Sequence, residues 1–350
     1  MGDMTEPVPL QPELLTTVAA RLERVESYKD EVGRILTTVP RETIDLWSIF
    51  RDDALVVSHF FDSLPGTIAV LDVGTFVGVS AFVFACQPNV AHVTTVDPNP
   101  FVQDELREVG GAAGIATIPT IAGLAQHSRV HDIARAALEG FPEERDEIQF
   151  EIGVITGGDD SVQEVAVPDP SVYGADLLVA FLDGLHTTPA VYSDLTAIFG
   201  AKPNAIVMLD DCRYFWGPFV QAGVAKFLES NPDFSFRLVC DSSSVVGTCT
   251  LGVVSHRDAR QMVDDAMERT VAAVAAAYGT LGAVDLVAGL QQEVTLLSEQ
   301  LADSRRKADE IAQVADEAAQ VIEQMRQTRV WRIGERISST RQTLRLGARP

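Results

Sequence analysis

Residues 68–80 read IAVLDVGTFVGVS, an apolar, β-branched run that passes directly into a turn with glycines at positions 74 and 78. The run has the composition of a buried strand, and the residues after Gly78 have that of a helix. Glycine allows another group to approach the backbone closely, and the first amides of a helix are free to bind a ligand. The stretch therefore predicts a strand, turn and helix of an α/β protein.

Further runs of similar character follow as far as residue 254, and helical patterns separate most of them. Together the runs cover residues 68–73, 92–97, 148–155, 176–183, 205–211, 234–240 and 247–254. Alternating strands and helices are typical of a parallel sheet with crossover helices. The last two runs are separated only by the short link DSSSVV, so we expect them to pair as an antiparallel hairpin. We predict an α/β fold with a seven-stranded, Rossmann-like sheet.

Helical segments flank this predicted domain, which we place at residues 65–256. Apolar spacing predicts helices over 11–39 and 43–64, within an N-terminal helical cap of residues 1–64. Two interpretations of this cap stay open: it covers an edge of the sheet, or it also forms a lid over a ligand. After the domain we predict a connecting helix within 257–284, a coiled coil over 285–330 and a basic amphipathic tail over 331–350.

The coiled coil is predicted from apolar residues at alternating steps of three and four, interrupted only by a serine. These positions are Val287, Leu290, Val294, Leu297, Leu301, Ser304, Ala308, Ile311, Ala315, Ala318, Ile322 and Met325. Such a seam is buried only against partner helices, so we expect a homo-oligomer. Residues 326–350 contain seven arginines and one acid. We predict contact of this tail with an anionic membrane surface, an anionic polymer or an acidic partner; a solvated helix end is the alternative.

Charge and composition exclude several classes of protein. The chain has 350 residues and a net charge of −23, which argues against nucleic acid as a partner, because a phosphate backbone is bound by a basic surface. No apolar run approaches the roughly 18 residues of a membrane span, and the start lacks the pattern of a secretory signal. We expect a cytoplasmic protein, with the tail allowing peripheral contact at the inner membrane face. The four scattered cysteines are expected to be reduced core residues.

The glycine turn does not have the spacing of a dinucleotide-binding site, because Phe76 and Val79 stand where G-x-G-x-x-G requires glycine. Together with Asp97, an acid at the end of the next run, D-x-G-x-x-x-G instead resembles motif I of class I S-adenosylmethionine-dependent methyltransferases. This resemblance implies that the cofactor is bound by Asp72, Gly74, Gly78 and Asp97. A glycine pair required only for tight packing is the alternative.

A second group of polar residues follows the fourth and fifth runs: Asp183 and His186 after the one, Asp210 and Asp211 after the other. The carboxyl ends of parallel strands meet at one edge of a sheet, where α/β proteins bind ligands. Three carboxylates there would repel one another, and Mg²⁺, which prefers carboxylate oxygens, would relieve the repulsion. The alternative is that the acids cap helices or point into solvent. His186, next to Thr188-Pro189 as a predicted helix start, suits a general base, although a lone histidine is also often structural.

At these residues the sequence resembles the sugar O-methyltransferase branch of the class I family, which is grouped with macrolide-sugar methyltransferases and cephalosporin-hydroxylase-like proteins. The similar stretches are DLLVAFLDGLHTTPAVYSDL (176–195) and AIVMLDDCRYFWGPFVQAGVAKFL (205–228), within a resemblance over about residues 65–255. The resemblance implies a seven-stranded Rossmann-like methyltransferase sheet, magnesium held by Asp183, Asp210 and Asp211, and His186 as the base. Leu185 and Thr188-Pro189 depart from the family pattern. The turn TGGDDS (156–161) resembles the family's adenine-side G-D-S turn, and we place its acid at Asp160.

Three further features bear on the acceptor. The long segment 110–141 is of a kind that often shapes substrate pockets, and we expect its His127 and His131 to lie on a surface helix rather than to bind metal. The aromatic residues Tyr214, Phe215 and Trp216 suit either stacking on a sugar or filling the core. The sequence thus predicts a magnesium-dependent S-adenosylmethionine O-methyltransferase acting on a hydroxyl of a sugar or glycan. The alternatives are a cephalosporin-hydroxylase-like tailoring protein and a non-catalytic coiled-coil scaffold in polysaccharide assembly.

Overall fold

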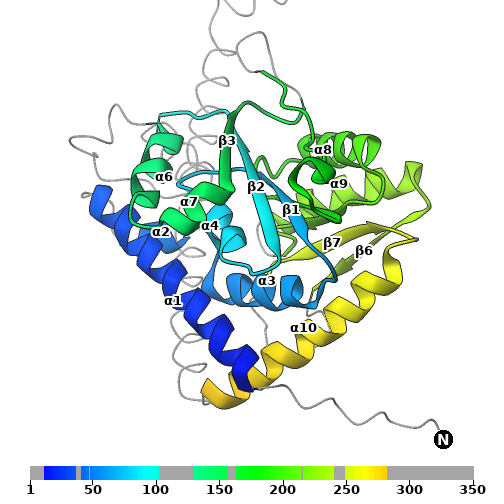
Figure 1. Ribbon diagram of the computed structural model, residues 1–350. Coiled ribbons are helices and arrows are strands. Elements are labelled where there is room, and N and C mark those ends of the chain that lie inside the picture. Colours follow the sequence, from blue (N-terminus) through cyan, green and yellow to red (C-terminus); the bar gives the residue numbers. More distant parts are fainter. Residues whose placement is uncertain are drawn as a thin grey trace, which may run out of the picture. The chain divides into compact units, whose positions relative to one another are not determined.

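A computed structural model describes residues 12–36, 41–46, 48–101, 129–156, 163–213, 216–239 and 249–281 of the protein (Figure 1). These residues form a seven-stranded sheet with the strand order β3-β2-β1-β4-β5-β7-β6. The strands are β1 (Ile68–Val73), β2 (Val90–Asp97), β3 (Ile148–Ile152), β4 (Leu177–Leu182), β5 (Ile206–Leu209), β6 (Phe234–Leu238) and β7 (Gly252–His256). All seven predicted strands are therefore present, and the predicted Rossmann-like methyltransferase sheet is confirmed.

The direction of the strands also follows the prediction. Strands β1 to β5 pair in parallel, and β7 is antiparallel to both β5 and β6. The predicted hairpin of the last two strands is confirmed, but β7 begins at Gly252, five positions after the start of the predicted run. Residues 249–251 of that run form a loop instead.

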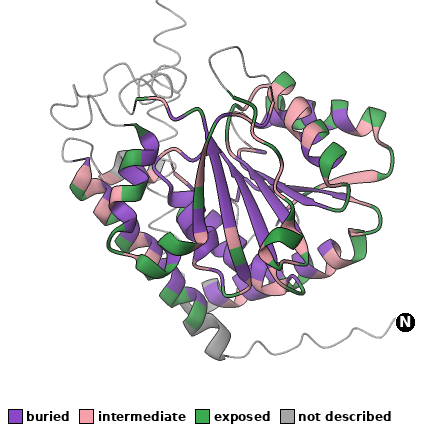
Figure 2. Cartoon of the chain, turned by 45° about the horizontal axis from the view of Figure 1, so that its top comes forward, coloured by how far each residue is buried: buried purple, intermediate pink, exposed green. Residues whose placement is uncertain are grey.

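Helices cover both faces of the sheet. They are α1 (Pro12–Ile35), α2 (Arg41–Leu46), α3 (Arg51–Ser63), α4 (Val79–Ala85), α6 (Val130–Leu138), α7 (Pro142–Glu147), α8 (Thr188–Ala201), α9 (Gly217–Ser230) and α10 (Arg260–Leu281), with a short 3₁₀ helix, η2 (Pro170–Tyr173). Ile68 and Val70 of β1 point into a core shared with α1, α3, α4, α6 and α10, whereas Ala69 and Leu71 point into a core shared with α8 and α9. The inner strands β1, β4, β5 and β7 are almost entirely buried between these layers, whereas the edge strands β3 and β6 are only partly buried (Figure 2).

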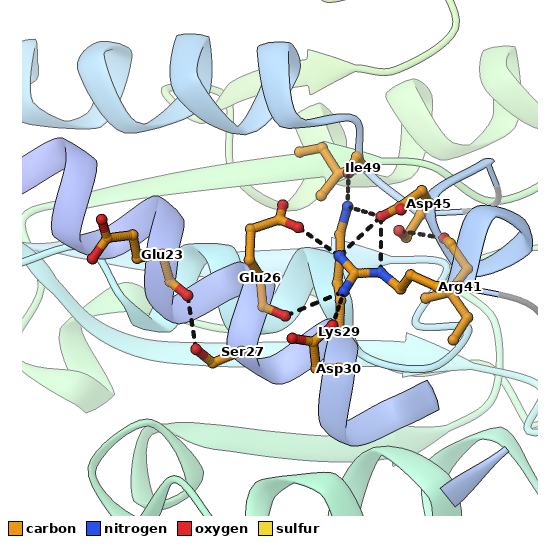
Figure 3. A network of polar contacts seen from close by, with 10 residues as sticks. Glu23, Glu26, Ser27, Lys29, Asp30, Arg41, Asp45 and Ile49 are labelled. Carbon is orange, nitrogen blue, oxygen red and sulfur yellow. Dashed lines mark hydrogen bonds and ion pairs between the residues drawn. The ribbon is translucent and has the colours of Figure 1, made fainter. Parts of the chain in front are cut away.

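The N-terminal helices differ from the prediction in two respects. The segment 43–64 is not one helix but two, α2 and α3, separated by residues 48–50, where Phe50 has an extended backbone. The buried Lys29 side chain links α2 to the segment that follows it. Its ammonium group donates to Asp45 at 3.2 Å and to the Ile49 carbonyl at 3.1 Å (Figure 3). Arg41 joins α2 to Glu26 and Asp30 of α1 in the same network. The helices cover a face of the sheet rather than an edge.

The C-terminal end of the described chain is α10, which packs along α3 and adds Val263, Ala266 and Val274 to the core (Figure 1). The helix predicted as a connection is thus part of the packed domain. The predicted coiled coil and basic tail lie outside the described residues. In the described parts of the chain, no helix is both long and apolar enough to span a membrane. Cys212 and Cys249 are buried core residues, as predicted.

Candidate active site

The glycine turn leaves β1 at the carboxyl edge of the sheet. Gly74 has a φ of +102°, and a Cβ there would lie 2.2 Å from the Asp183 carbonyl oxygen at the end of β4. Gly78 has a φ of +81°, and a Cβ there would lie 2.8 Å from the Tyr28 hydroxyl of α1. Both positions thus require glycine for backbone conformation and for packing within the protein itself. Packing within the protein is sufficient to explain glycine at both positions, and cofactor binding by this turn stays a prediction.

Asp72 shapes the turn from inside the protein. Its side chain is fully buried, and Oδ2 accepts hydrogen bonds from Ser80 of α4 at 3.0 Å and from Thr95 of β2 at 2.8 Å. Burial raises the pKa of Asp72 to about 8, because the charged form is poorly solvated there. Asp72 therefore faces the core rather than the open side of the turn, and a contribution to cofactor binding would act through the shape of the turn.

Asp97 joins the end of β2 to the same turn. Its Oδ1 accepts a hydrogen bond from the Asn99 amide at 2.6 Å, and its Oδ2 accepts one from the Phe76 amide at 3.3 Å. Burial raises the pKa of Asp97, and these amide contacts oppose the change. Because a carboxylate offers about four acceptor positions, Asp97 retains capacity for a hydroxyl of a ribose. Cofactor binding by Asp97 stays a prediction.

His131 was expected on a surface helix, and this prediction is wrong. The side chain is fully buried on α6, and its Nε2 lies 3.4 Å from the Thr75 hydroxyl, which in turn contacts the Thr95 hydroxyl at 2.5 Å. Burial lowers the pKa of His131 to about 4, so the ring is neutral near pH 7. His131 thus forms part of the wall behind the glycine turn.

In the second predicted group of polar residues, Asp183 and Asp211 come together around the imidazole of His186. His186 Nε2 lies 3.4 Å from Asp183 Oδ1, and His186 Nδ1 lies 3.6 Å from Asp211 Oδ2, so the ring is placed between two carboxylates. Thr187, rather than Thr188, is the N-cap of α8, and its hydroxyl accepts a hydrogen bond from the Ala190 amide at 3.4 Å. Asp211 adopts a φ of +51°, a left-handed conformation that aspartate tolerates better than most residues.

The electrostatics of this cluster follow from its burial and charge. Burial and the nearby Asp210 raise the pKa of Asp183 to about 6 and that of Asp211 to about 7. Burial alone would lower the pKa of His186, but the surrounding carboxylates, Asp183 first, raise it to about 9. The imidazole is therefore mainly protonated near pH 7 and partly neutralises the two acids beside it.

The Asp210 side chain is hydrogen-bonded to Thr250 rather than to His186. Its Oδ1 accepts hydrogen bonds from the Thr250 hydroxyl at 2.6 Å and from the Asp211 amide at 2.7 Å. The three acids have the oxygen donors that Mg²⁺ prefers. Their arrangement does not form a metal site, however: among the described residues, no three carboxylate, imidazole or thiolate groups converge on one point that could hold a metal ion. The His186 ring fills the position between Asp183 and Asp211.

An apolar surface borders His186. The Trp216 ring lies 5.9 Å from the imidazole and 6.3 Å from the Phe219 ring, centre to centre, and the Thr188 hydroxyl donates to the Phe219 carbonyl at 3.0 Å. Leu185 and Phe219 are exposed.

Asp160, His127, Tyr214 and Phe215 lie outside the described residues. The structure adds three residues that the sequence analysis did not connect with the site, Tyr28, Asp53 and Thr250, because their contacts join segments far apart in the chain.

No protein-family model matches the chain, and no curated protein matches it. Similar solved structures include a putative O-methyltransferase from Klebsiella pneumoniae, at 13% identity and a TM-score of 0.37, covering 71% of this chain and 91% of that one. An O-methyltransferase from Bacillus cereus in complex with S-adenosylhomocysteine has 14% identity and a TM-score of 0.36, covering 73% and 94%.

A third similar structure is the O-methyltransferase TomG from Streptomyces achromogenes, which is involved in tomaymycin synthesis and was solved with S-adenosylmethionine. It has 14% identity and a TM-score of 0.35, and the alignment covers 71% of this chain and 91% of that one. The strand order and the antiparallel seventh strand are themselves those of a Rossmann-like methyltransferase sheet.

Proposed function

We propose that the protein is an S-adenosylmethionine-dependent O-methyltransferase whose acceptor is a hydroxyl of a sugar or glycan. The observation that carries this proposal is the contact between Gly74 and Asp183. The Asp183 amide donates to the Val73 carbonyl at 2.9 Å, and only a glycine fits against the Asp183 carbonyl. The turn expected to hold a cofactor therefore adjoins the cluster that contains a base. Cofactor binding and proton removal would share one edge of the sheet.

The positions of the described residues support the following roles. Asp97 and the turn from Gly74 to Gly78 would hold the cofactor, which supplies an electrophilic methyl group when bound. His186 in its neutral form would accept the proton of the acceptor hydroxyl, and the oxygen would keep the electron pair that forms the new bond to the methyl carbon. The bond between that carbon and the cofactor sulfur would break in the same displacement, with its electron pair going to sulfur, and S-adenosylhomocysteine would be the other product. Asp183 and Asp211 would then stabilise the imidazolium. Only a small fraction of His186 is neutral near pH 7, because the same two acids raise its pKa to about 9, and this fraction limits activity there.

The sugar or glycan acceptor rests on the sequence resemblance and on the apolar surface beside His186. Trp216 is half-buried at the edge of the cluster, where an aromatic ring can stack on the apolar face of a sugar. Magnesium dependence stays a prediction from the sequence. Its proposed ligands Asp183, Asp210 and Asp211 would have to rearrange around an ion, since the present side-chain positions do not fit one. No catalytic step above is derived through the metal.

The experiment is transfer of labelled methyl from S-adenosylmethionine to a panel of sugars and glycans, each with and without excess chelator. His186→Ala should lower kcat by about 10²–10⁴-fold. His256→Ala is the matched control, because His256 also lies beside an aspartate, with Nδ1 3.3 Å from Asp258, but at the far end of β7. Equal rates in wild type and His186→Ala would remove the base assignment. Unchanged rates in chelator would remove the metal prediction and leave the methyltransferase proposal intact.

A further inference from the structure

Asp53 is a buried acid that the proposed mechanism does not use. It lies on α3, in the N-terminal helical segment, and is 1% exposed. Its Oδ1 accepts a hydrogen bond from the Thr250 amide at 3.1 Å, and its Oδ2 lies 3.3 Å from the Thr250 hydroxyl. The Cys249 thiol also faces this carboxyl group. Burying an acid is energetically unfavourable unless its polar atoms are hydrogen-bonded.

The partner of Asp53 leads directly to the candidate active site. The Thr250 hydroxyl lies 2.6 Å from Asp210 Oδ1, and the same oxygen accepts the Asp211 amide at 2.7 Å. The Thr250 carbonyl accepts the Cys212 amide at 2.8 Å, which anchors the loop before β7 to the end of β5. Thr250 thus stands between an acid of the N-terminal helices and the turn that carries Asp211.

The number of available hydrogens determines which group donates in each contact of the Thr250 hydroxyl. A hydroxyl has one hydrogen, so Thr250 cannot donate to both carboxyl groups at once. The shorter contact assigns that hydrogen to Asp210, and the contact with Asp53 is then favourable only when Asp53 Oδ2 carries a proton and donates to Thr250. Complete burial, and next the charge of Asp210, raise the pKa of Asp53 well above its usual value, in agreement with this assignment.

We propose that Asp53 is a positioning residue: as a neutral hydrogen-bond donor it orients the Thr250 hydroxyl toward Asp210 and so fixes the turn that places Asp211 against His186. The N-terminal helical segment is then not only a cover for the sheet but also a support for the active site. The consequence for catalysis rests on the function proposed above. The structural part of the proposal, the dependence of the His186 environment on Asp53, does not.

The substitution Asp53→Asn distinguishes a neutral donor from a charged acid. Its amide oxygen can accept from the Thr250 amide, and its NH₂ group can donate to the Thr250 hydroxyl, so it reproduces neutral Asp53. Asp53→Ala removes both contacts, and Thr250→Val removes only the hydroxyl while nearly keeping the shape of the side chain. Thr250→Ser keeps the hydroxyl. Asp176→Asn is the matched control, because Asp176 also accepts a backbone amide, that of Thr67 at 2.9 Å, but at the opposite edge of the sheet.

The first measurement is independent of activity. The ring ¹⁵N chemical shifts of His186, recorded by NMR at one fixed pH on the full chain, report whether Asp211 is in place. We expect Asp53→Asn, Thr250→Ser and Asp176→Asn to retain the wild-type shifts, and Asp53→Ala and Thr250→Val to change them. If Asp53→Ala does not fold, Thr250→Val still decides the matter. Wild-type shifts in a folded Thr250→Val variant, or changed shifts in Asp53→Asn, would overturn the proposal.

The second measurement uses the methyl-transfer assay together with calorimetric titration of S-adenosylhomocysteine. We expect Thr250→Val to lower kcat by about 10–100-fold, as loss of a supporting hydrogen bond commonly does, with the affinity for S-adenosylhomocysteine nearly unchanged. A purely structural role would lower stability and leave kcat of the folded protein as it is, which would overturn the catalytic part. If wild type transfers no methyl group, the proposed function fails, and the NMR result still stands on its own.

Discussion

The hydroxyl of Tyr28, on α1, donates a hydrogen bond of 2.9 Å to the carbonyl oxygen of Val77, within the glycine turn. The Tyr28 ring stacks on Phe82 of α4 with 4.3 Å between ring centres, and the hydroxyl occupies the space that a Cβ at Gly78 would need. The first helix of the chain therefore supports the turn that is expected to bind the cofactor. The N-terminal segment contributes to the site from two sides, through Tyr28 and through Asp53.

Tyr28→Phe tests this support. The substitution keeps the stacked ring and removes one buried hydrogen bond, so we expect a loss of about 1 kcal/mol in the free energy of unfolding and a several-fold weaker affinity for S-adenosylhomocysteine. Chemical denaturation and calorimetry measure the two effects. Tyr173→Phe is the control, since the Tyr173 ring stacks on His92 with 3.7 Å between ring centres, before β4 begins. Equal affinity in the two variants would show that the turn does not depend on Tyr28.

Acid should destabilise the protein through its buried histidines. His59 of α3 is 1% exposed, neither ring nitrogen has a hydrogen-bond partner among the described residues, and burial lowers its pKa to about 4. The unfolded chain binds the proton near pH 6.5 and the folded protein only near pH 4, so the unfolded state gains protons first and stability falls as the pH is lowered through this window. The loss attributable to His59 is on the order of 3 kcal/mol.

His59→Leu isolates this contribution. We expect the variant to lose much less stability than wild type between pH 7 and pH 4.5, while its stability at pH 8 is equal or higher because two unpartnered nitrogens are gone. Thermal denaturation across this pH range gives both values for each protein. An unchanged pH dependence would assign the acid sensitivity to other groups, of which His131 is the next candidate.

The rate of methyl transfer should rise with pH. The base must be neutral to accept a proton, and the carboxylates around His186 raise its pKa to about 9, so kcat/KM should increase about tenfold per pH unit below that value and level off above it. Asp211→Asn removes one of these charges and should move the rise to lower pH. A profile that is flat between pH 6 and pH 9 would contradict His186 as the base.

Local patterns predicted the sheet well and the site only in part. All seven strands were predictable because each is a compact apolar run, and the meeting of Asp183, His186 and Asp211 followed from parallel topology. Three features were not predictable. The break between α2 and α3 depends on a contact of Lys29 with Ile49. The buried position of His131 depends on its contact with Thr75, and the orientation of the Asp210 side chain depends on its hydrogen bond from Thr250. Each involves a contact between segments distant in sequence, which hydrophobic spacing does not record.

The heptad between Val287 and Met325 leads to a separate prediction. We propose that the full chain is an oligomer through this segment and that a protein ending at Leu281, the last described residue, is a smaller species that still binds S-adenosylhomocysteine, because every described site residue precedes that point. Light scattering on the two proteins at micromolar concentration decides this. Monomers in both samples would mean that the seam packs within one chain.

The central claim, a cofactor site built on the glycine turn and Asp97, is tested most directly by calorimetric titration of S-adenosylhomocysteine into wild type, Asp97→Asn and Asp176→Asn. We predict that wild type binds one equivalent, and that Asp97→Asn binds about 10–100-fold more weakly because a charged acceptor for the ribose hydroxyls is lost. Asp176→Asn, which alters an exposed acid that also accepts a backbone amide but at the other edge of the sheet, should bind as wild type does. No binding by the folded wild-type protein, or equal affinity in Asp97→Asn and wild type, would contradict the account.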